Sequence, residues 1–275
     1  MAEETNYVYC FMIYIIGHLF GLSALFWVGM WIDYDKSGFG FHERADLEFK
    51  FHPICMALSL VFLNGEAVMI YRGLRFWPKF VTKAIHAVLH TVSFVFMVLG
   101  LKAAWDYHDY HRTNGVITPT PNALYPHSWV GLATASLYGV QFAGGIVTFY
   151  FPPTPMHIRA AFMPVHRSVG LLIFAFSLGA ALMGTGEKAA FSLRCKPANT
   201  LCTENLYVNF FVLSLLGYGA CVMLMTIPPH WIRKPLPSEL PPSQIVQIHP
   251  HNNREPLTFK TQVNGDHQDS FKTSL

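Results

Sequence analysis

The chain has 275 residues, of which 52% are hydrophobic, 15% aromatic and only 13% charged, and its formal net charge is +3. This charged fraction is about half that of an ordinary soluble domain, and the small net charge argues against a nucleic-acid-binding protein. The charges form short clusters between apolar runs of about 20 residues, the length that crosses a bilayer core of roughly 30 Å. Composition therefore excludes a soluble globular protein and predicts a multi-pass protein of the lipid bilayer.

Six apolar runs, taken in chain order, predict six transmembrane segments: residues 8–32, 52–71, 84–105, 128–150, 164–183 and 206–227. Backbone polar groups in lipid must pair within their own segment, so each run is predicted to be helical and the protein all-α. The first run follows Glu3 and Glu4 where a signal peptide would carry basic residues, and we interpret it as a retained helix. Small residues in the later runs favour close helix packing. They include Gly139, Gly144, Gly145, Gly179 and Gly184.

Residues 1–232 are predicted to form the transmembrane domain. Residues 233–275 are predicted to form a disordered cytoplasmic tail, because the sequence becomes proline-rich and polar from Arg233 onward. An even number of spans puts both termini on one side. The loops after spans two and four are basic, whereas segments 33–51 and 106–126 carry more acidic than basic residues. The positive-inside rule therefore predicts that both termini are cytoplasmic.

Five cysteines occur without a CxxC motif. Cys10, Cys55 and Cys221 lie in apolar runs and are predicted to be buried thiols that behave as small hydrophobic residues. Cys195 and Cys202 lie in one polar loop, where a disulfide is expected if the loop faces an oxidising compartment.

Four of the 14 histidines lie near the starts of the four central spans. Because successive spans alternate in direction, His52 and His127 share one depth near the outer face, and His86 and His166 share one near the inner face. Two imidazoles that face each other across a helical bundle can ligate one haem iron axially. Spans two to five are therefore predicted to form a four-helix bundle that holds two haems. Helical rise and bilayer thickness place the irons about 20 Å apart.

The sequence leaves open one alternative ligand and two alternative functions. His90 lies one turn after His86 on the same helix face, so depth alone does not exclude it as the inner ligand. A histidine-based proton-coupled transporter without haem would use a mid-membrane carboxylate, for which Glu66 is the candidate. A non-catalytic haem-binding redox sensor would hold the same haems without net electron flow. His18, alone in span one, is predicted to be a packed core residue.

Six segments follow one another in a specific order: Phe49-Lys-Phe-His-Pro-Ile, Ile70-Tyr-Arg, Lys83-Ala-Ile-His-Ala, His127-Ser-Trp-Val-Gly, Arg159-Ala-Ala-Phe-Met-Pro-Val-His and Gly186-Glu-Lys. In these segments the chain resembles the cytochrome b561 family of ascorbate-dependent transmembrane reductases. The resemblance implies two haem b groups, one held by His52 and His127 outside and the other by His86 and His166 on the cytoplasmic side. It therefore favours His86 over His90 as the inner ligand.

The resemblance also implies the reaction partners. Cytoplasmic ascorbate is the expected electron donor, and monodehydroascorbate or ferric iron is the expected outer acceptor, with His108 at the outer substrate site. Asp33 stands where iron-reducing members are expected to carry a histidine, which weakens the ferric reductase assignment. A homodimer is expected, in the plasma membrane or in a secretory or endolysosomal vesicle membrane.

Four basic residues lie on the predicted cytoplasmic side near the inner histidines: Arg72, Lys79, Lys83 and Arg159. Ascorbate is a monoanion near neutral pH, so cationic side chains at this position predict a donor site. The alternative is that they only satisfy the positive-inside rule and contact lipid headgroups. Proximity to His86 and His166 favours the donor site for Lys83 and Arg159.

Overall fold

The computed structural model describes residues 2–41, 44–150, 154–193 and 201–239. The chain divides into two compact units, Met1–Lys234 and Pro235–Leu275. In the second unit the structure describes one short 3-10 helix, η4 (Pro237–Glu239). The predicted tail therefore lies largely outside the described residues.

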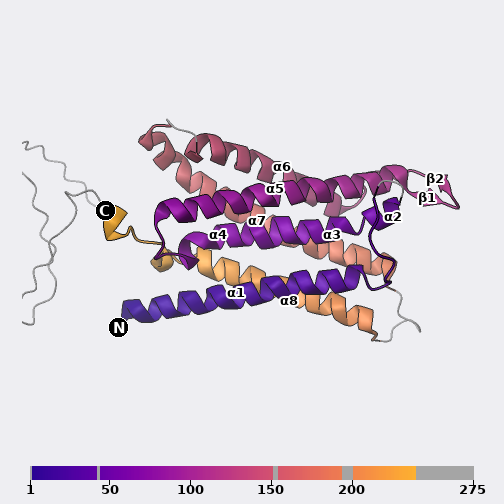
Figure 1. Ribbon diagram of the computed structural model, residues 1–275, viewed down its shortest axis with the longest axis horizontal. Coiled ribbons are helices and arrows are strands. Elements are labelled where there is room, and N and C mark those ends of the chain that lie inside the picture. Colours follow the sequence, from indigo (N-terminus) through magenta and orange to yellow (C-terminus); the bar gives the residue numbers. More distant parts are fainter. Residues whose placement is uncertain (1, 42–43, 151–153, 194–200, 240–275) are drawn as a thin grey trace, which may run out of the picture. The chain divides into compact units, whose positions relative to one another are not determined.

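Six helices long and apolar enough to span a membrane confirm the predicted all-α fold. Four spans are single helices: α1 (Ala2–Ile32), α5 (Lys79–Tyr110), α7 (Met156–Ser192) and α8 (Thr203–Thr226). The second span is made of α2 (Ala45–Glu48), α3 (Phe51–Met56), η1 (Ala57–Leu63) and α4 (Asn64–Gly73). The fourth span is made of α6 (Pro126–Gly145) and η2 (Ile146–Tyr150). Figure 1 shows these spans side by side. A short 3-10 helix, η3 (Pro229–Trp231), follows α8.

Several spans extend beyond the apolar runs that predicted them, and α5 and α7 do so at the ends that carry predicted site residues. α5 begins at Lys79 rather than at residue 84, and α7 begins at Met156, so Pro164 lies inside the helix instead of at its start. An apolar run marks only the hydrocarbon part of a span, whereas the helix continues through the polar headgroup region. Consequently Lys83 and Arg159 lie in the first turns of helices rather than in loops.

The second span contains a π-helical segment, η1, between α3 and α4. Hydrogen bonds in a π-helix run from residue i to i+5, so the backbone pairing is locally displaced and carbonyls become available to other donors. Side chains bind three carbonyl oxygens of η1: Ser93 Oγ binds Ser59 O at 2.9 Å, Asn64 Nδ2 binds Leu60 O at 3.1 Å, and Tyr218 Oη binds Phe62 O at 2.8 Å. The bonds from Ser93 and Tyr218 attach span two to α5 and α8, and the bond from Asn64 lies within span two.

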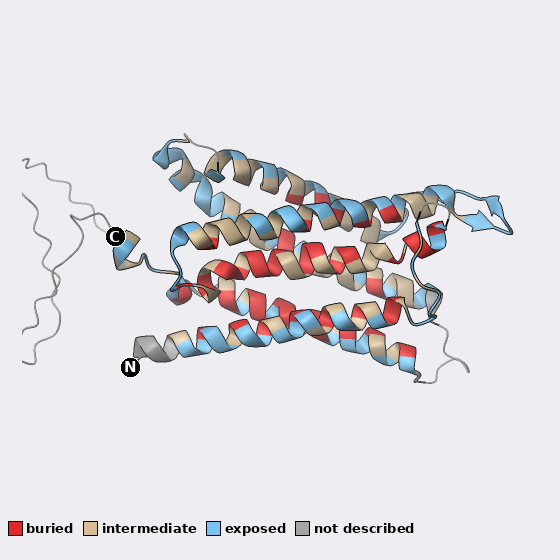
Figure 2. Cartoon of the chain, viewed as in Figure 1, coloured by how far each residue is buried: buried red, intermediate tan, exposed pale blue. Residues whose placement is uncertain are grey.

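Span two is the most buried of the six, and Figure 2 shows buried residues concentrated along it. α1 and α8 pack lengthwise against each other and against span two, around a core that includes Val28, Met69, Leu215 and Tyr218. Spans two to five share a second, smaller apolar cluster. Its buried members are Leu60, Met97, Ala135, Tyr138 and Ile173. The predicted four-helix bundle is thus flanked by α1 and α8.

A small hairpin follows α5. Strands β1 (Arg112–Thr113) and β2 (Val116–Ile117) pair antiparallel across Asn114 and Gly115, whose φ angles of 54° and 83° are those of a tight hairpin turn. The segment after β2 returns to the helix end, where Thr120 N donates to His108 O at 2.8 Å. This contact fixes the backbone at His108.

The cysteines agree with the prediction where the structure describes them. Cys10, Cys55 and Cys221 are buried free thiols. Cys202 is disulfide-bonded. Cys195, its expected partner, lies outside the described residues.

Candidate functional site

The outer pair consists of His52 on α3 and His127 on α6, whose ring centres lie 6.0 Å apart. His52 Nδ1 lies 2.9 Å from the carbonyl oxygen of Gly100, and His127 Nδ1 lies 2.9 Å from that of Ala180. An Nδ1–H that donates to a carbonyl leaves Nε2 as the unprotonated nitrogen, which is the form that binds a metal. Both rings are therefore oriented as ligands.

The inner pair consists of His86 on α5 and His166 on α7, with ring centres 6.3 Å apart. His86 Nδ1 lies 2.8 Å from the carbonyl oxygen of Ala67. Within the described part of the chain, the buried Nδ1 of His166 has no hydrogen-bond partner. The inner pair thus repeats the outer arrangement with one backbone contact instead of two.

The separation within each pair fits one iron. An imidazole nitrogen lies about 1 Å from its ring centre and binds a metal at about 2 Å, so two rings on opposite sides of one iron have centres about 6 Å apart. Both pairs have this separation, at 6.0 and 6.3 Å. A haem iron takes only two axial ligands from the protein. The side chains present therefore fit two bis-histidine haems.

The two pairs are also linked through shared helices. Gly100, which binds His52, lies 14 residues after His86 in α5, and Ala180, which binds His127, lies 14 residues after His166 in α7. At 1.5 Å per residue this spacing corresponds to about 21 Å along each helix axis. Each of these helices thus carries one inner histidine and contacts one outer histidine, at the separation expected from the sequence.

Two of the glycines attributed to helix packing lie against the histidine rings. A Cβ at Gly184 would lie 2.6 Å from Cε1 of His127, and a Cβ at Gly145 would lie 3.4 Å from Cε1 of His166. Gly144 and Gly179 have no such neighbour within 4 Å. The sequence pattern does not distinguish these two kinds of glycine, because the contact depends on the opposing helix.

His90 has a different environment from His86. Its ring centre lies 4.4 Å from that of His86, and its Nδ1 lies 2.9 Å from Tyr138 Oη. The Tyr138 hydroxyl in turn lies 3.2 Å from the His90 carbonyl oxygen and donates to it. His90 is thus attached to Tyr138, whereas His86 faces His166 at ligand separation. This geometry favours His86 as the inner ligand.

Three of the predicted donor-site cations gather beside the inner pair. Lys83 Nζ donates to Phe149 O at 2.6 Å, and the Phe149 ring lies 5.1 Å from the ring of His166. Lys79 and Arg159 both lie within electrostatic range of Lys83. In the described part of the chain, Arg159 Nε is buried without a hydrogen-bond partner. The arrangement leaves positive charge next to the inner histidines.

Arg72, the fourth predicted donor-site cation, binds backbone carbonyls at the end of α8 instead. It is 7% exposed, and its Nη1 donates to the carbonyl oxygens of Met225 and Pro228, both at 2.6 Å. These carbonyls lie at the C-terminal end of α8, where a cation is stabilised by the helix dipole. Its contacts therefore favour a structural role over the predicted donor-site role.

On the outer side, a run of ring contacts leads from the outer pair to His108. The ring of Phe49 lies 5.6 Å from that of His52 and 4.6 Å from that of Tyr107, which lies 5.6 Å from that of His108. His108 Nδ1 lies 2.8 Å from Thr120 Oγ1. The predicted acceptor residue is therefore in continuous aromatic contact with the outer pair.

Asp33 lies in a charged segment near the same end. Lys50 Nζ lies 3.7 Å from Asp33 and 2.7 Å from Asp35. The hydrogen bond from Lys50 holds the pKa of the Asp35 carboxyl well below its usual range. Asp33 thus shares a cation with a second carboxylate.

Glu66, the mid-membrane carboxylate, is also paired. Its Oε2 lies 3.3 Å from His18 Nε2, and its Oε1 lies 3.1 Å from Tyr218 Oη. The Tyr14 ring packs 4.3 Å from that of His18. The His18 side chain is 34% exposed and paired with a carboxylate, so it is half-buried rather than the packed core residue that was predicted. The cluster joins α1, α4 and α8 on the side of span two that faces α1 and α8.

Comparison with known proteins identifies a family and several relatives. Residues 51–192 match the family described as eukaryotic cytochrome b561. A Caenorhabditis elegans homologue of the transmembrane ascorbate-dependent reductase is 36% identical over 241 residues, which cover 87% of this chain and 91% of that protein. The plasma membrane ascorbate-dependent reductase of Xenopus tropicalis is 34% identical over 226 residues, covering 81% and 77%. The transmembrane ascorbate-dependent reductase of Mus musculus is 32% identical over 249 residues, covering 90% of each chain.

Proposed function

The chain belongs to the eukaryotic cytochrome b561 family of transmembrane oxidoreductases, and on that basis we propose that it transfers single electrons from ascorbate at one membrane face to an acceptor at the other. This membership confirms the resemblance found in the sequence. The observation that carries the proposal is the pairing of four histidines at separations of 6.0 and 6.3 Å.

The histidine pairs would hold two haem b groups, one near each membrane face. A haem iron with two histidine ligands supplies one-electron redox chemistry without an open coordination position, which suits electron transfer rather than oxygen activation. The carbonyl oxygens of Gly100, Ala180 and Ala67 lie within hydrogen-bond distance of Nδ1 of their histidine partners, so Nε2 would be the nitrogen that binds each iron. The protein thereby fixes the orientation of its ligands before the cofactor binds.

The donor site is proposed at Lys79, Lys83 and Arg159. Ascorbate loses one electron and one proton in the reaction, and its anionic form is attracted by cations and pairs with them through its enolate oxygens. Lys83 is held beside the inner pair through Phe149, so an anion bound there lies close to His166. The positive-inside rule supports cytoplasmic termini and hence a cytoplasmic donor site.

The acceptor site is proposed at His108. Its ring contacts through Tyr107 and Phe49 lead to the outer pair. An imidazole suits either acceptor, since it can ligate ferric iron or donate a hydrogen bond to monodehydroascorbate. Asp33, at the position that weakens the ferric assignment, lies beside Lys50, which makes monodehydroascorbate the first acceptor to test.

An absorption spectrum of the purified full chain, before and after ascorbate addition, is the first test. We expect a b-type haem spectrum with about two haems per chain, reduced by ascorbate, because each pair supplies both axial ligands of one iron. A colourless protein from haem-supplied cells would contradict the proposal and favour the histidine-based transporter.

Electron flux separates the reductase from a redox sensor. The chain is reconstituted in vesicles that enclose ferricyanide, an impermeant one-electron acceptor that needs no specific binding site, and ascorbate is added to the other side. We expect reduction of the enclosed acceptor in proportion to the amount of protein. Full haem content without any flux would identify a sensor instead.

Replacing Lys83 by alanine is expected to raise the ascorbate concentration for half-maximal haem reduction about tenfold, since a hydrogen bond to a charged group contributes about 1.5–3 kcal/mol. Haem content and the spectrum should not change. Arg112→Ala, in the hairpin beyond α5, is the matched control. If the ascorbate concentration for half-maximal haem reduction is unchanged in Lys83→Ala, Lys83 contacts lipid headgroups and does not bind ascorbate.

A further inference from the structure

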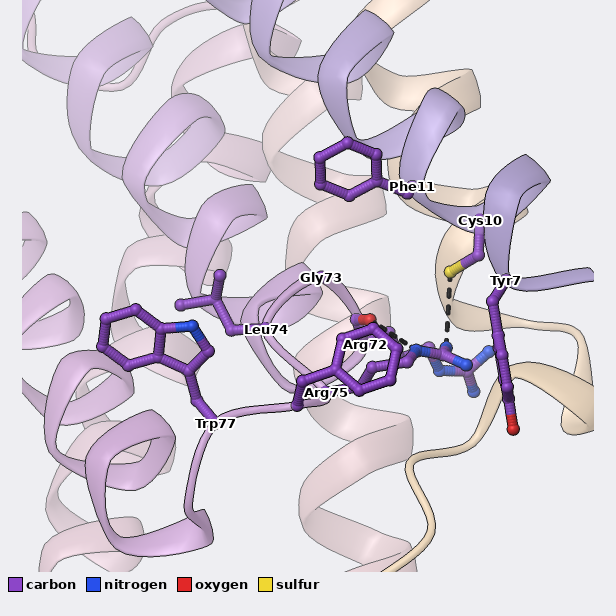
Figure 3. Close-up of a pocket in the computed structure, with 9 residues that line it drawn as sticks. Tyr7, Cys10, Phe11, Arg72, Gly73, Leu74, Arg75 and Trp77 are labelled. Atoms are coloured by element: carbon purple, nitrogen blue, oxygen red, sulfur yellow. Dashed lines mark hydrogen bonds between the residues drawn. The ribbon is translucent and has the colours of Figure 1, made fainter. Parts of the chain in front are cut away.

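A cavity of about 370 Å³ lies where α4 ends, between the first turns of α1 and the short connection to α5 (Figure 3). Its apolar wall includes Phe11, Leu74 and Trp77. Two guanidinium groups, those of Arg72 and Arg75, also line it. The cavity therefore combines an apolar wall with two cations at one end of the membrane spans.

Both arginines are 7% exposed. Arg75 Nε donates to Arg72 O at 3.1 Å, and its Nη2 lies 2.9 Å from Trp231 O and 3.4 Å from Cys10 Sγ. Tyr7 covers the guanidinium, with its ring centre 4.6 Å from Cζ. The hydrogen bonds of the described residues use Nη1 of Arg72 and Nε and Nη2 of Arg75, and the remaining guanidinium nitrogens are not among the buried side-chain atoms that lack a partner, so they are accessible at the cavity. Each guanidinium thus keeps a donor for a further ligand.

The local charge is unbalanced. Among the described residues, neither Arg72 nor Arg75 forms an ion pair with a carboxylate, and Arg167 adds a third cation within electrostatic range of Arg72. Helix C-terminal carbonyls supply only about half an elementary negative charge per helix. Buried charges are stable when they are paired. The excess of positive charge calls for an anion.

The wall chemistry determines which anion fits. A small hydrophilic anion would leave the apolar wall without a partner, whereas a phospholipid supplies a phosphate and an acyl chain together. Phe76 and Trp77, beside the cavity, are 71% and 51% exposed, as expected of aromatic residues at the level of the lipid headgroups. Basic pockets between helices at this level bind acidic lipid headgroups.

We propose that this cavity is a binding site for one anionic phospholipid, whose phosphate accepts hydrogen bonds from Arg75 and Arg72 and whose acyl chain lies along the apolar wall. The bound lipid attaches α1 to the α4–α5 connection. The proposal is independent of the haem and of the electron acceptor.

Native mass spectrometry of the detergent-purified full chain tests the proposal, with phosphatidylglycerol and phosphatidylcholine of identical acyl chains as probes. We expect one phosphatidylglycerol to be retained per chain and phosphatidylcholine to be lost. Arg75→Gln should weaken retention at least about tenfold, as the loss of a charge-assisted hydrogen bond does. Arg75→Lys should retain more lipid than Arg75→Gln, and Arg112→Gln should match the unmodified chain.

Trp77→Ala is the second variant, because its side chain is half-exposed and its loss should weaken lipid retention without affecting the buried arginines. Equal retention of both lipids, or unchanged retention in Arg75→Gln and Trp77→Ala, would overturn the proposal. Displacement of the lipid by millimolar inorganic phosphate would overturn it in favour of a small-anion site. Displacement of the lipid by ascorbate would also overturn the proposal and would assign Arg72 to the donor site.

Discussion

Replacing His127 by alanine is expected to remove the outer haem and leave the inner haem bound, so haem content falls from about two per chain to about one. In the proposed arrangement each iron would have only two protein ligands, and the inner pair lies about 21 Å away along α7, too far for direct contact. His52→Ala should behave in the same way, and His86→Ala or His166→Ala should remove the inner haem instead. Haem quantification per chain, with low-temperature spectra that resolve the two sites, measures the effect.

His90→Ala is the matched control for the inner site, since His90 lies on the same face of α5 but is bonded to Tyr138. It should retain both haems, with at most a shifted spectrum for the inner one. The assignment would be refuted by full retention of both haems in His127→Ala. Loss of the inner haem in His90→Ala, but not in His86→Ala, would show that His90, one helical turn further along α5, is the inner ligand.

Gly184→Ala is expected to reduce occupancy of the outer haem by more than half while leaving the inner haem unaffected. The added Cβ would lie 2.6 Å from Cε1 of His127, closer than any ordinary contact. The ring cannot easily move, because its Nδ1 is bonded to Ala180 O and its Nε2 is the proposed ligand. Gly184→Val should abolish outer-haem binding. The same haem quantification as for the histidine variants measures both.

Gly179→Ala serves as the comparison, since it makes the same change in the same helix where no neighbour lies within 4 Å. It should leave both haems in place. Equal effects of the two substitutions would indicate a general disturbance of α7 rather than displacement of His127. A normal outer haem in Gly184→Val would show that the His127 ring does not need its present position.

Apolar runs were sufficient to predict all six spans, because crossing lipid requires a long helix whatever it packs against. Depth along alternating spans also paired His52 with His127 and His86 with His166 before any contact was known. Depth could not separate His86 from His90, since both lie on one face of α5. That distinction comes from Tyr138, which lies on another helix.

Backbone contacts account for most of what the sequence did not predict. Gly100, Ala180 and Ala67 bind histidines through carbonyl oxygens, which every residue possesses, so residue type carries no signal. Gly184 did carry a signal, but the pattern of small residues assigned it to helix packing. The role of Arg72 depends on where α8 ends, a tertiary feature that a run of basic residues does not encode.

Span two takes part in both histidine pairs. It carries His52 of the outer pair, and its Ala67 carbonyl binds His86 of the inner pair. The π-helical segment η1, between these two contacts, accommodates one residue more than an α-helix of the same rise. A relative with a fully α-helical second span would need one residue fewer there. In an alignment with such a relative, the single gap belongs within residues 57–63. A gap placed on either side would align one of the two contact residues with its neighbour in the relative. That neighbour points about 100° away around the helix axis.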